Sequence, residues 1–145
     1  MLYPARGFNQ VQVGERFESA MTLTETHIVL GAGLFGDFNR LHVDEPFAQQ
    51  SRHGGRIAHG YLTSSLIAAS YGMVFHGTAV AYLEHACKFL KPVRAGDTLA
   101  TVWEVTDLTP KPKHDGGIVA MKASCTNQHG EVVAEATGTM LVKNA

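Results

Sequence analysis

The second half of this 145-residue chain consists of four β-rich runs separated by turn signals. The runs span residues 80–90, 98–106, 118–126 and 132–142. The segments between them contain the turn-forming residues Pro92, Gly96, Pro110, Pro112 and Gly130. Short runs with such turns favour a mostly antiparallel sheet, because antiparallel neighbours can be joined by tight connections. This sheet is the strongest constraint on what the chain can fold into.

The last run indicates what covers the sheet. Small or apolar residues alternate along it with more polar ones, and the apolar set is Val132, Ala134, Ala136, Gly138, Met140 and Val142. A period of two is typical of a strand with one face on a core. Because glycine and alanine leave room above the strand, we expect a helix to pack there.

A segment suited to that position lies at residues 60–71, which are rich in leucine, alanine and serine. Gly72 follows as a C-cap that would end this helix. One long helix and a sheet of about five strands bury each other only if the sheet curls round the helix. We therefore predict an α+β hot-dog fold, with a curled antiparallel sheet around one long helix, in a single domain over residues 1–145.

Shorter elements are expected ahead of this helix. Residues 15–22 have the pattern of a strand, which supplies the fifth strand of the sheet. Thr24 can cap a helix with apolar residues at 28–30, and Asp44 can cap a short helix at 45–50. The residues with the most reactive side chains lie between these pieces.

Asp37 and His42 lie five residues apart in the stretch Gly-Asp-Phe-Asn-Arg-Leu-His. On a regular helix, five steps of about 100° leave two side chains about 140° apart, so this pair would diverge. The two residues can share a pocket only if the helix breaks between them, and Gly36 and Asn39 tolerate such a break. The alternative is that Asp37 or Asn39 caps the next helix while His42 lies on the surface.

His59 and Gly60 stand at the start of the predicted 60–71 helix. The first N–H groups of a helix lack intrahelical partners and lie at the positive end of its dipole. They can bind a carbonyl oxygen that gains negative charge, and glycine lets a substrate approach the amide closely. The alternative is that the glycines at 54, 55 and 60 only form a tight loop.

Three stretches resemble the MaoC-like dehydratase family, and within it the (R)-specific enoyl-CoA hydratases. They read Leu-Phe-Gly-Asp-Phe-Asn-Arg-Leu-His-Val-Asp at 34–44, Arg-Ile-Ala-His-Gly at 56–60, and Phe-Leu-Lys-Pro-Val-Arg-Ala-Gly-Asp-Thr-Leu at 89–99. The first corresponds to the family's hydratase signature and the third to a structural hairpin. The resemblance implies hydration of trans-2-enoyl-CoA to (R)-3-hydroxyacyl-CoA, or the reverse dehydration, within fatty acid metabolism.

The resemblance also implies roles for individual residues. Asp37 and His42 become the catalytic pair, and the amide of Gly60 becomes the oxyanion donor. Together they supply a base for water, an acid for the Cα carbon and a donor for the thioester oxygen. No metal or redox cofactor is implied, and coenzyme A enters as part of the substrate.

Asn39 matches the asparagine of the family motif and would help to hold the site. His59 belongs to the motif too, and we expect it to fix its loop by a hydrogen bond. Ser65 falls where family members often carry a serine near the catalytic carboxylate. The chain departs from the family pattern at Arg40, where proline is usual, and at Phe35, where a small hydroxyl residue is usual. Both departures bear on the shape of the acyl pocket.

Composition and spacing exclude several other classes of protein. The formal net charge is -1, with no charge block, so we expect no nucleic-acid partner. No stretch approaches the roughly 20 apolar residues of a membrane span, and the N-terminal residues lack the regions of a signal peptide. Cys87 and Cys125 lack CxxC or zinc-ligand spacing, and the histidines show no zinc motif. We expect a cytoplasmic protein without a metal site.

Two other functions fit the same residues. A hot-dog thioesterase would use Asp37 to activate water against the thioester carbon, and a non-catalytic subunit would bind acyl-CoA without turnover. A homodimer or a higher even oligomer is expected in each case, because such a sheet leaves an exposed edge. The basic residues considered as contacts to coenzyme A phosphates are Arg52, Arg56, Lys88, Lys91 and Arg94.

Overall fold

A computed structural model describes residues 5–145 of the chain. The sequence predicts no targeting segment at the N-terminus, and the first four residues of that stretch lie outside the described range. The elements, in chain order, are a 3-10 turn Phe8–Gln10, β1 Arg16–Thr22, α1 Glu25–Phe35, α2 Arg40–Val43, α3 Glu45–Gln50, α4 Gly60–Val74, β2 Ala79–Phe89, β3 Thr98–Lys111, a 3-10 turn Pro112–His114, β4 Gly116–Thr126 and β5 Val132–Lys143.

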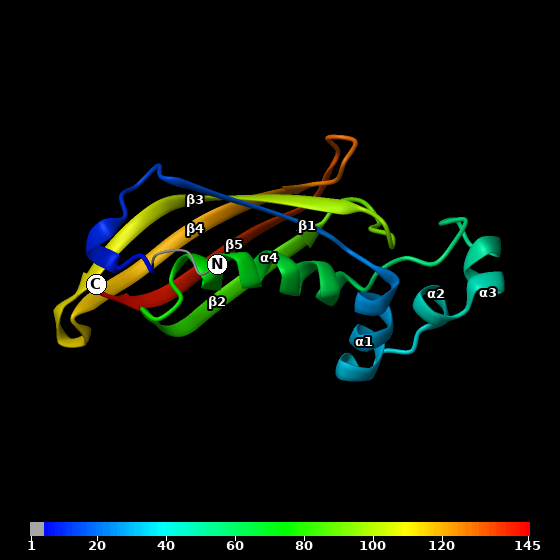
Figure 1. The fold of residues 1–145 in the computed structure, drawn as a ribbon, viewed down its shortest axis with the longest axis horizontal. Coiled ribbons are helices and arrows are strands. Elements are labelled where there is room, and N and C mark those ends of the chain that lie inside the picture. Colours follow the sequence, from blue (N-terminus) through cyan, green and yellow to red (C-terminus); the bar gives the residue numbers. More distant parts are fainter. Residues whose placement is uncertain (1–4) are drawn as a thin grey trace.

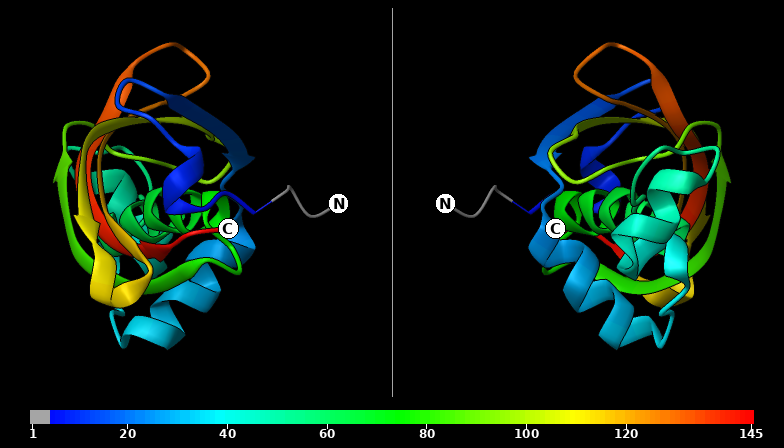
Figure 2. Two further views of the ribbon diagram at one scale, coloured as in Figure 1. Left: turned by 90° about the vertical axis from the view of Figure 1, so that its left-hand side faces the viewer. Right: turned by 90° about the vertical axis from the view of Figure 1, so that its right-hand side faces the viewer.

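The five strands form one antiparallel sheet with the order β1-β3-β4-β5-β2. The sheet curls round α4, which runs through its hollow side (Figure 1 and Figure 2). Helices α1, α2 and α3 lie beyond one end of the sheet, next to the N-terminal end of α4 (Figure 1). The predicted curled α+β architecture is therefore present, with an additional helical segment at one end.

The contact between α4 and the sheet depends on the small residues of β5. Ala134, Ala136 and Met140 are buried on the inner face, as the alternating pattern predicts. At Gly138 an added Cβ would lie 3.0 Å from a ring carbon of Tyr71, which is fully buried on α4. Gly138 thus provides the space that the large aromatic residue of the helix occupies.

Two predicted boundaries are wrong. Helix α4 does not end at Gly72 but continues to Val74, because the buried Phe75 closes it by donating its N–H to the carbonyl of Gly72. Strand β3 does not end before Pro110 but pairs this residue with Gly117 of β4. Strand β1 pairs with β3 only as far as Glu104, so this part of β3 is an edge, where proline is tolerated.

The predicted caps of the smaller helices are confirmed. Thr24 is the N-cap of α1, and Asp44 starts α3 by accepting the N–H of Phe47 at 3.1 Å. Among residues 5–145, no helix combines the length and apolar character needed to cross a membrane.

Candidate active site

The chain between α1 and α2 makes the break that Asp37 and His42 require. Gly36 ends α1 in the left-handed conformation, at φ 69°. Asn39 then starts α2, since its side-chain oxygen accepts the N–H of Leu41 at 3.1 Å. Asn39 is therefore a helix cap, as in the alternative considered above. His42 nevertheless does not lie on the surface, because only 12% of its side chain is exposed.

The contacts of His42 determine which of its nitrogens is free. Its Nδ1 lies 2.8 Å from the carbonyl oxygen of Ile57. A carbonyl oxygen only accepts, so Nδ1 carries the proton and Nε2 of the neutral ring keeps a lone pair. The distance from Nε2 of His42 to Oδ2 of Asp37 is 3.7 Å. This is too long for a direct hydrogen bond, and one water molecule can bridge the two atoms.

His59 supports both members of this pair. Its Nε2–H donates to the backbone carbonyl of Asp37 at 2.9 Å. Its ring also stacks on that of His42, with 3.9 Å between centroids and 31° between planes. The remaining nitrogen, Nδ1, is buried near Gly31 without a hydrogen-bond partner. His59 is thus fully enclosed, and it holds the backbone of one residue of the pair and the ring of the other.

Gly60 is the first residue of α4, and its N–H has no acceptor among the described residues. Its φ is not positive, so the backbone here accepts other residues. An added Cβ would lie 3.1 Å from the ring of Phe89, which comes from the end of β2. Phe35 of α1 also borders this place, since its ring contacts those of His59 and Tyr61. The free amide therefore lies among aromatic side chains.

Ser65 is exposed, and its hydroxyl donates to the carbonyl of Tyr61 at 2.7 Å. The neighbouring Ser64, absent from the sequence prediction, is buried and lies 2.8 Å from Nε2 of His85 on β2. The other ring nitrogen of His85 lies 3.2 Å from the hydroxyl of Tyr82. Burial lowers the pKa of His85 and raises the pKa of Tyr82 to about 12. No sequence signal pairs Ser64 with His85, because the two meet only through the packing of α4 on β2.

Asp37, His42 and His59 offer ligand atoms within 4.8 Å of one another, which is close enough for a shared metal ion. His59 must keep a proton on Nε2 to donate to a carbonyl oxygen, and its other nitrogen is buried. Asp37 and His42 alone therefore offer accessible lone pairs, fewer than the three protein ligands of a catalytic zinc site. The arrangement fits acid–base chemistry better.

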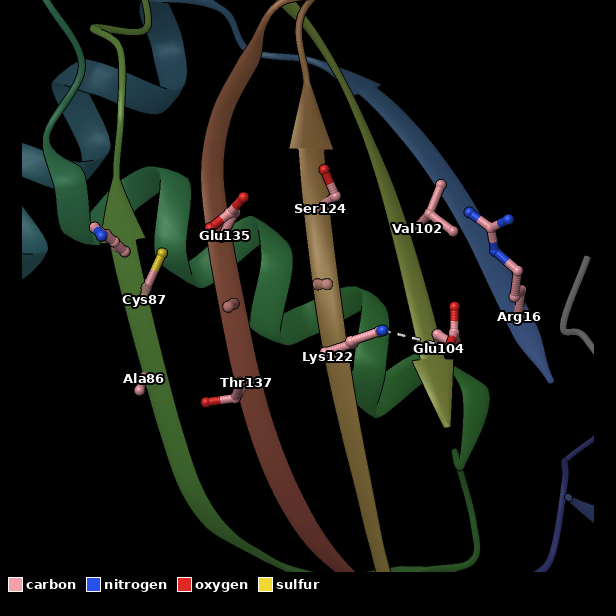
Figure 3. Close-up of a pocket in the computed structure, with 12 residues that line it drawn as sticks. Arg16, Ala86, Cys87, Val102, Glu104, Lys122, Ser124, Glu135 and Thr137 are labelled. Atoms are coloured by element: carbon pink, nitrogen blue, oxygen red, sulfur yellow. Dashed lines mark ion pairs between the residues drawn. The ribbon is translucent and has the colours of Figure 1, made fainter. Parts of the chain in front are cut away.

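A separate hollow lies away from these residues. It has a volume of about 650 Å³ and spans the strands on the sheet face turned away from α4 (Figure 3). Charged residues border it, including Glu104 and Lys122, which pair at 3.5 Å. None of the residues predicted for catalysis or for the oxyanion lines it, although Lys88, considered as a contact to coenzyme A phosphates, does. The N-terminal end of α4, where a base, a bridging position and a free amide coincide, is therefore the candidate active site.

Comparisons with known proteins bear on the family and the fold of the chain. A family model described as MaoC like domain matches residues 8–127. An (R)-specific enoyl-CoA hydratase of Rhodospirillum rubrum is 37% identical over 135 residues, covering 93% of this chain and 90% of that protein. The unliganded R-hydratase structure from Pseudomonas aeruginosa superposes with a TM-score of 0.86 at 29% identity, covering 97% of this chain and 88% of that one.

A double hotdog protein of Mycobacterium tuberculosis shows the fold alone, since it is 19% identical. It superposes with a TM-score of 0.87 and covers 97% of this chain and 45% of its own. The predicted hot-dog fold is confirmed.

Proposed function

Because this chain belongs to the MaoC-like domain family, we propose that it adds water to a trans-2-enoyl-CoA to give an (R)-3-hydroxyacyl-CoA, and that it catalyses the reverse dehydration. The observation that carries the proposal is the free Nε2 lone pair of His42, 3.7 Å from the carboxylate of Asp37 and beside the open N-terminus of α4. The hydratases of similar sequence and structure support the choice of reaction.

One water molecule bridges the pair in this mechanism. It donates one hydrogen to Nε2 of His42 and the other to Oδ2 of Asp37, and its oxygen lone pair attacks the Cβ carbon of the substrate. The pair removes a proton from this water as the carbon–oxygen bond forms. The hydrogen bond from Nδ1 of His42 to Ile57 keeps the ring in the tautomer that accepts this proton.

The second half of the reaction takes place at the Cα carbon. As the hydroxyl adds to Cβ, negative charge builds on the thioester oxygen, and the N–H of Gly60 donates to it at the positive end of α4. The proton held by the pair then goes to Cα. Because the same pair handles both steps, the hydroxyl and the proton add to one face of the double bond.

This reaction moves protons and changes no oxidation state. We therefore propose that it requires neither a metal ion nor a redox cofactor, and that coenzyme A takes part only as a portion of the substrate. A cytoplasmic location stays a prediction, for which the two unpaired cysteines, Cys87 and Cys125, are the support.

The partner we propose is a second copy of the chain. Strand β2 is an edge of the sheet within the described residues, and four apolar residues along or just beyond it, Val80, Leu83, Phe89 and Leu90, are about half exposed. Pairing two β2 strands would extend the sheet and cover these side chains. Size measurement in solution tests this, and a fully active monomer at micromolar concentration would refute it.

A panel of enoyl-CoA thioesters of increasing chain length tests the activity. Loss of the enone absorbance without release of free thiol is the expected result. Release of coenzyme A, detected with a thiol reagent, would show a thioesterase instead. Tight binding of the thioesters with neither change would indicate a non-catalytic acyl-CoA-binding subunit.

A further inference from the structure

Arg56 begins the short segment on which the catalytic groups depend. The next residue, Ile57, accepts the hydrogen bond from His42 and donates its own N–H to the carbonyl of Leu41 at 3.1 Å. After Ala58, His59 donates to the carbonyl of Asp37 and Gly60 presents the free amide. Any shift of residues 56–60 would therefore move the proton-transfer pair and the oxyanion donor relative to each other.

The guanidinium of Arg56 bridges two carboxylates. Its Nε donates to Glu45 at 2.6 Å, and its two terminal nitrogens donate to both oxygens of Glu25 at 2.5 and 3.2 Å. The hydrogen bond from Arg56 lowers the pKa of the Glu45 carboxyl, so this pair is charged at neutral pH. The side chain of Arg56 is 27% exposed and those of Glu25 and Glu45 are 49% and 43% exposed, so water screens the two carboxylates more than the guanidinium.

The two carboxylates come from elements on either side of the catalytic pair. Glu25 is the first residue of α1, which ends just before Asp37, and Glu45 is the first residue of α3, which follows the helix carrying His42. These helices lie beyond the end of the sheet (Figure 1). Arg56 thus links the segment before α4 to α1 and to α3 through charged hydrogen bonds. Asp37 and His42 lie between these two helices in the chain.

We propose that Arg56 is a positioning residue, which sets the distance between the Asp37 and His42 pair and the Gly60 amide. The inference rests on the proposed hydration. A misplacement of about 1 Å can reduce the rate of an enzyme about a hundredfold, so a residue without substrate contact can act strongly on turnover. The sequence offered Arg56 as a contact to coenzyme A phosphates instead. The structure opposes that role, because both edges of its guanidinium already face carboxylates.

The test compares Arg56→Gln and Arg56→Lys on two substrates, an enoyl-CoA and the corresponding N-acetylcysteamine thioester, which lacks the phosphates. A positioning role predicts that Arg56→Gln lowers kcat at least about tenfold on both substrates, with KM within about twofold. Arg56→Lys keeps the charge but lacks the planar fork that binds both oxygens of Glu25, so it should restore only part of kcat. An increase in KM confined to the coenzyme A ester would overturn the proposal in favour of phosphate binding.

Arg6→Gln provides the matched control. It removes an ion pair of similar exposure, between Arg6 and Glu15 at 2.5 Å, in the segment before β1, which contributes no residue to the site. Its kcat should equal that of the wild type even if its melting temperature falls as far as that of Arg56→Gln. Should Arg56→Gln fail to fold, Glu25→Gln removes one partner only and should still lower kcat. Unchanged kcat in the Arg56 or Glu25 variant would overturn the inference, whereas an inactive wild type would refute the proposed function itself.

Discussion

The first and last turns of α4 differ in how they are surrounded. At the C-terminal end, Tyr71 and Phe75 are fully buried, and Tyr71 packs against Trp103 with 4.8 Å between ring centroids. At the N-terminal end, Tyr61 is 75% exposed and Gly60 presents a free amide. One helix therefore packs in the core at one end and borders the proposed site at the other. Mutations at its two ends should separate these two properties.

Each end of α4 has a glycine beside an aromatic ring, Gly60 at the N-terminal end and Gly138 of β5 near the C-terminal end. An added Cβ would meet the ring of Phe89 at Gly60, and the ring of Tyr71 at Gly138. Phe89 is half exposed in the single chain and lies at the end of β2, whereas Tyr71 is fully buried and donates its hydroxyl to the carbonyl of Val119 at 2.7 Å. The same missing side chain thus leaves a free amide for a ligand at one end and gives space for packing at the other.

The largest expected effect is on turnover, at the catalytic pair. Asp37→Asn and His42→Ala should each lower kcat at least about a hundredfold, the usual contribution of a general acid or base. Their melting temperatures should stay near that of the wild type, because Asp37 is 45% exposed and neither side chain belongs to the core. Steady-state kinetics beside thermal melting measures both. Full activity in either variant would end the assignment of the pair.

Loss of stability without loss of turnover is expected for the core around the C-terminal end of α4. Trp103 is 1% exposed, and its Nε1–H donates to the carbonyl of Ile67 at 3.1 Å and to Ser70 at 3.0 Å. Trp103→Ala should reduce the free energy of unfolding by about 3–5 kcal/mol, the range for large aromatic truncations. The remaining folded enzyme should keep its kcat. Loss of kcat in protein shown to be folded would mean that the two ends of α4 are not independent.

Gly60 and Gly138 give a smaller but more direct comparison. Gly60→Val should lower kcat/KM at least about tenfold with little change in melting temperature, since a side chain there obstructs the substrate and displaces only Phe89. Gly138→Val should lower the melting temperature and leave kcat/KM nearly unchanged, because overpacking against Tyr71 costs about 1–3 kcal/mol of stability. An unchanged kcat/KM in Gly60→Val would place the oxyanion site elsewhere.

The smallest effect concerns His85, next to the first turns of α4. Its pKa is lowered by burial, so folding favours the neutral ring. Stability from this group is fully present above the ordinary histidine pKa of about 6.5 and is lost as the pH falls through the lower folded value. The wild type should therefore lose more melting temperature between pH 7 and 5 than His85→Gln. Equal losses would show that His85 titrates alike in the folded and unfolded chain.

Local signals in the sequence predict much of this molecule. Caps at Thr24 and Asp44 and the alternating residues of β5 depend on neighbours within a few positions. Both caps are confirmed, and so is the alternation from Ala134 to Val142, whereas at the start of the strand Val133 is buried in place of Val132. Gly72 and Pro110 also carry strong local signals, but tertiary packing overrides them. Phe75 extends α4 by entering the core, and the end of β1 makes part of β3 an edge.

The candidate site, too, depends partly on local signals and partly on long-range contacts. The break between Asp37 and His42 follows from the turn chemistry of Gly36 and Asn39, so the sequence predicts that the pair can meet. The contacts that orient the pair are long-range and carry no local signal. Ile57 accepts from His42 across 15 positions, and Arg56 reaches Glu25 across 31. Only the folded chain brings these groups together.

Product analysis in deuterium oxide tests the central claim, that one acid–base pair beside the α4 amide hydrates the double bond. An enoyl-CoA is incubated with the enzyme, and the product is examined for chirality, for deuterium at Cα and for free thiol. We predict an (R)-3-hydroxyacyl-CoA with one deuterium added to the same face as the hydroxyl, and no released coenzyme A. Addition to opposite faces, a racemic product or free coenzyme A would contradict the account.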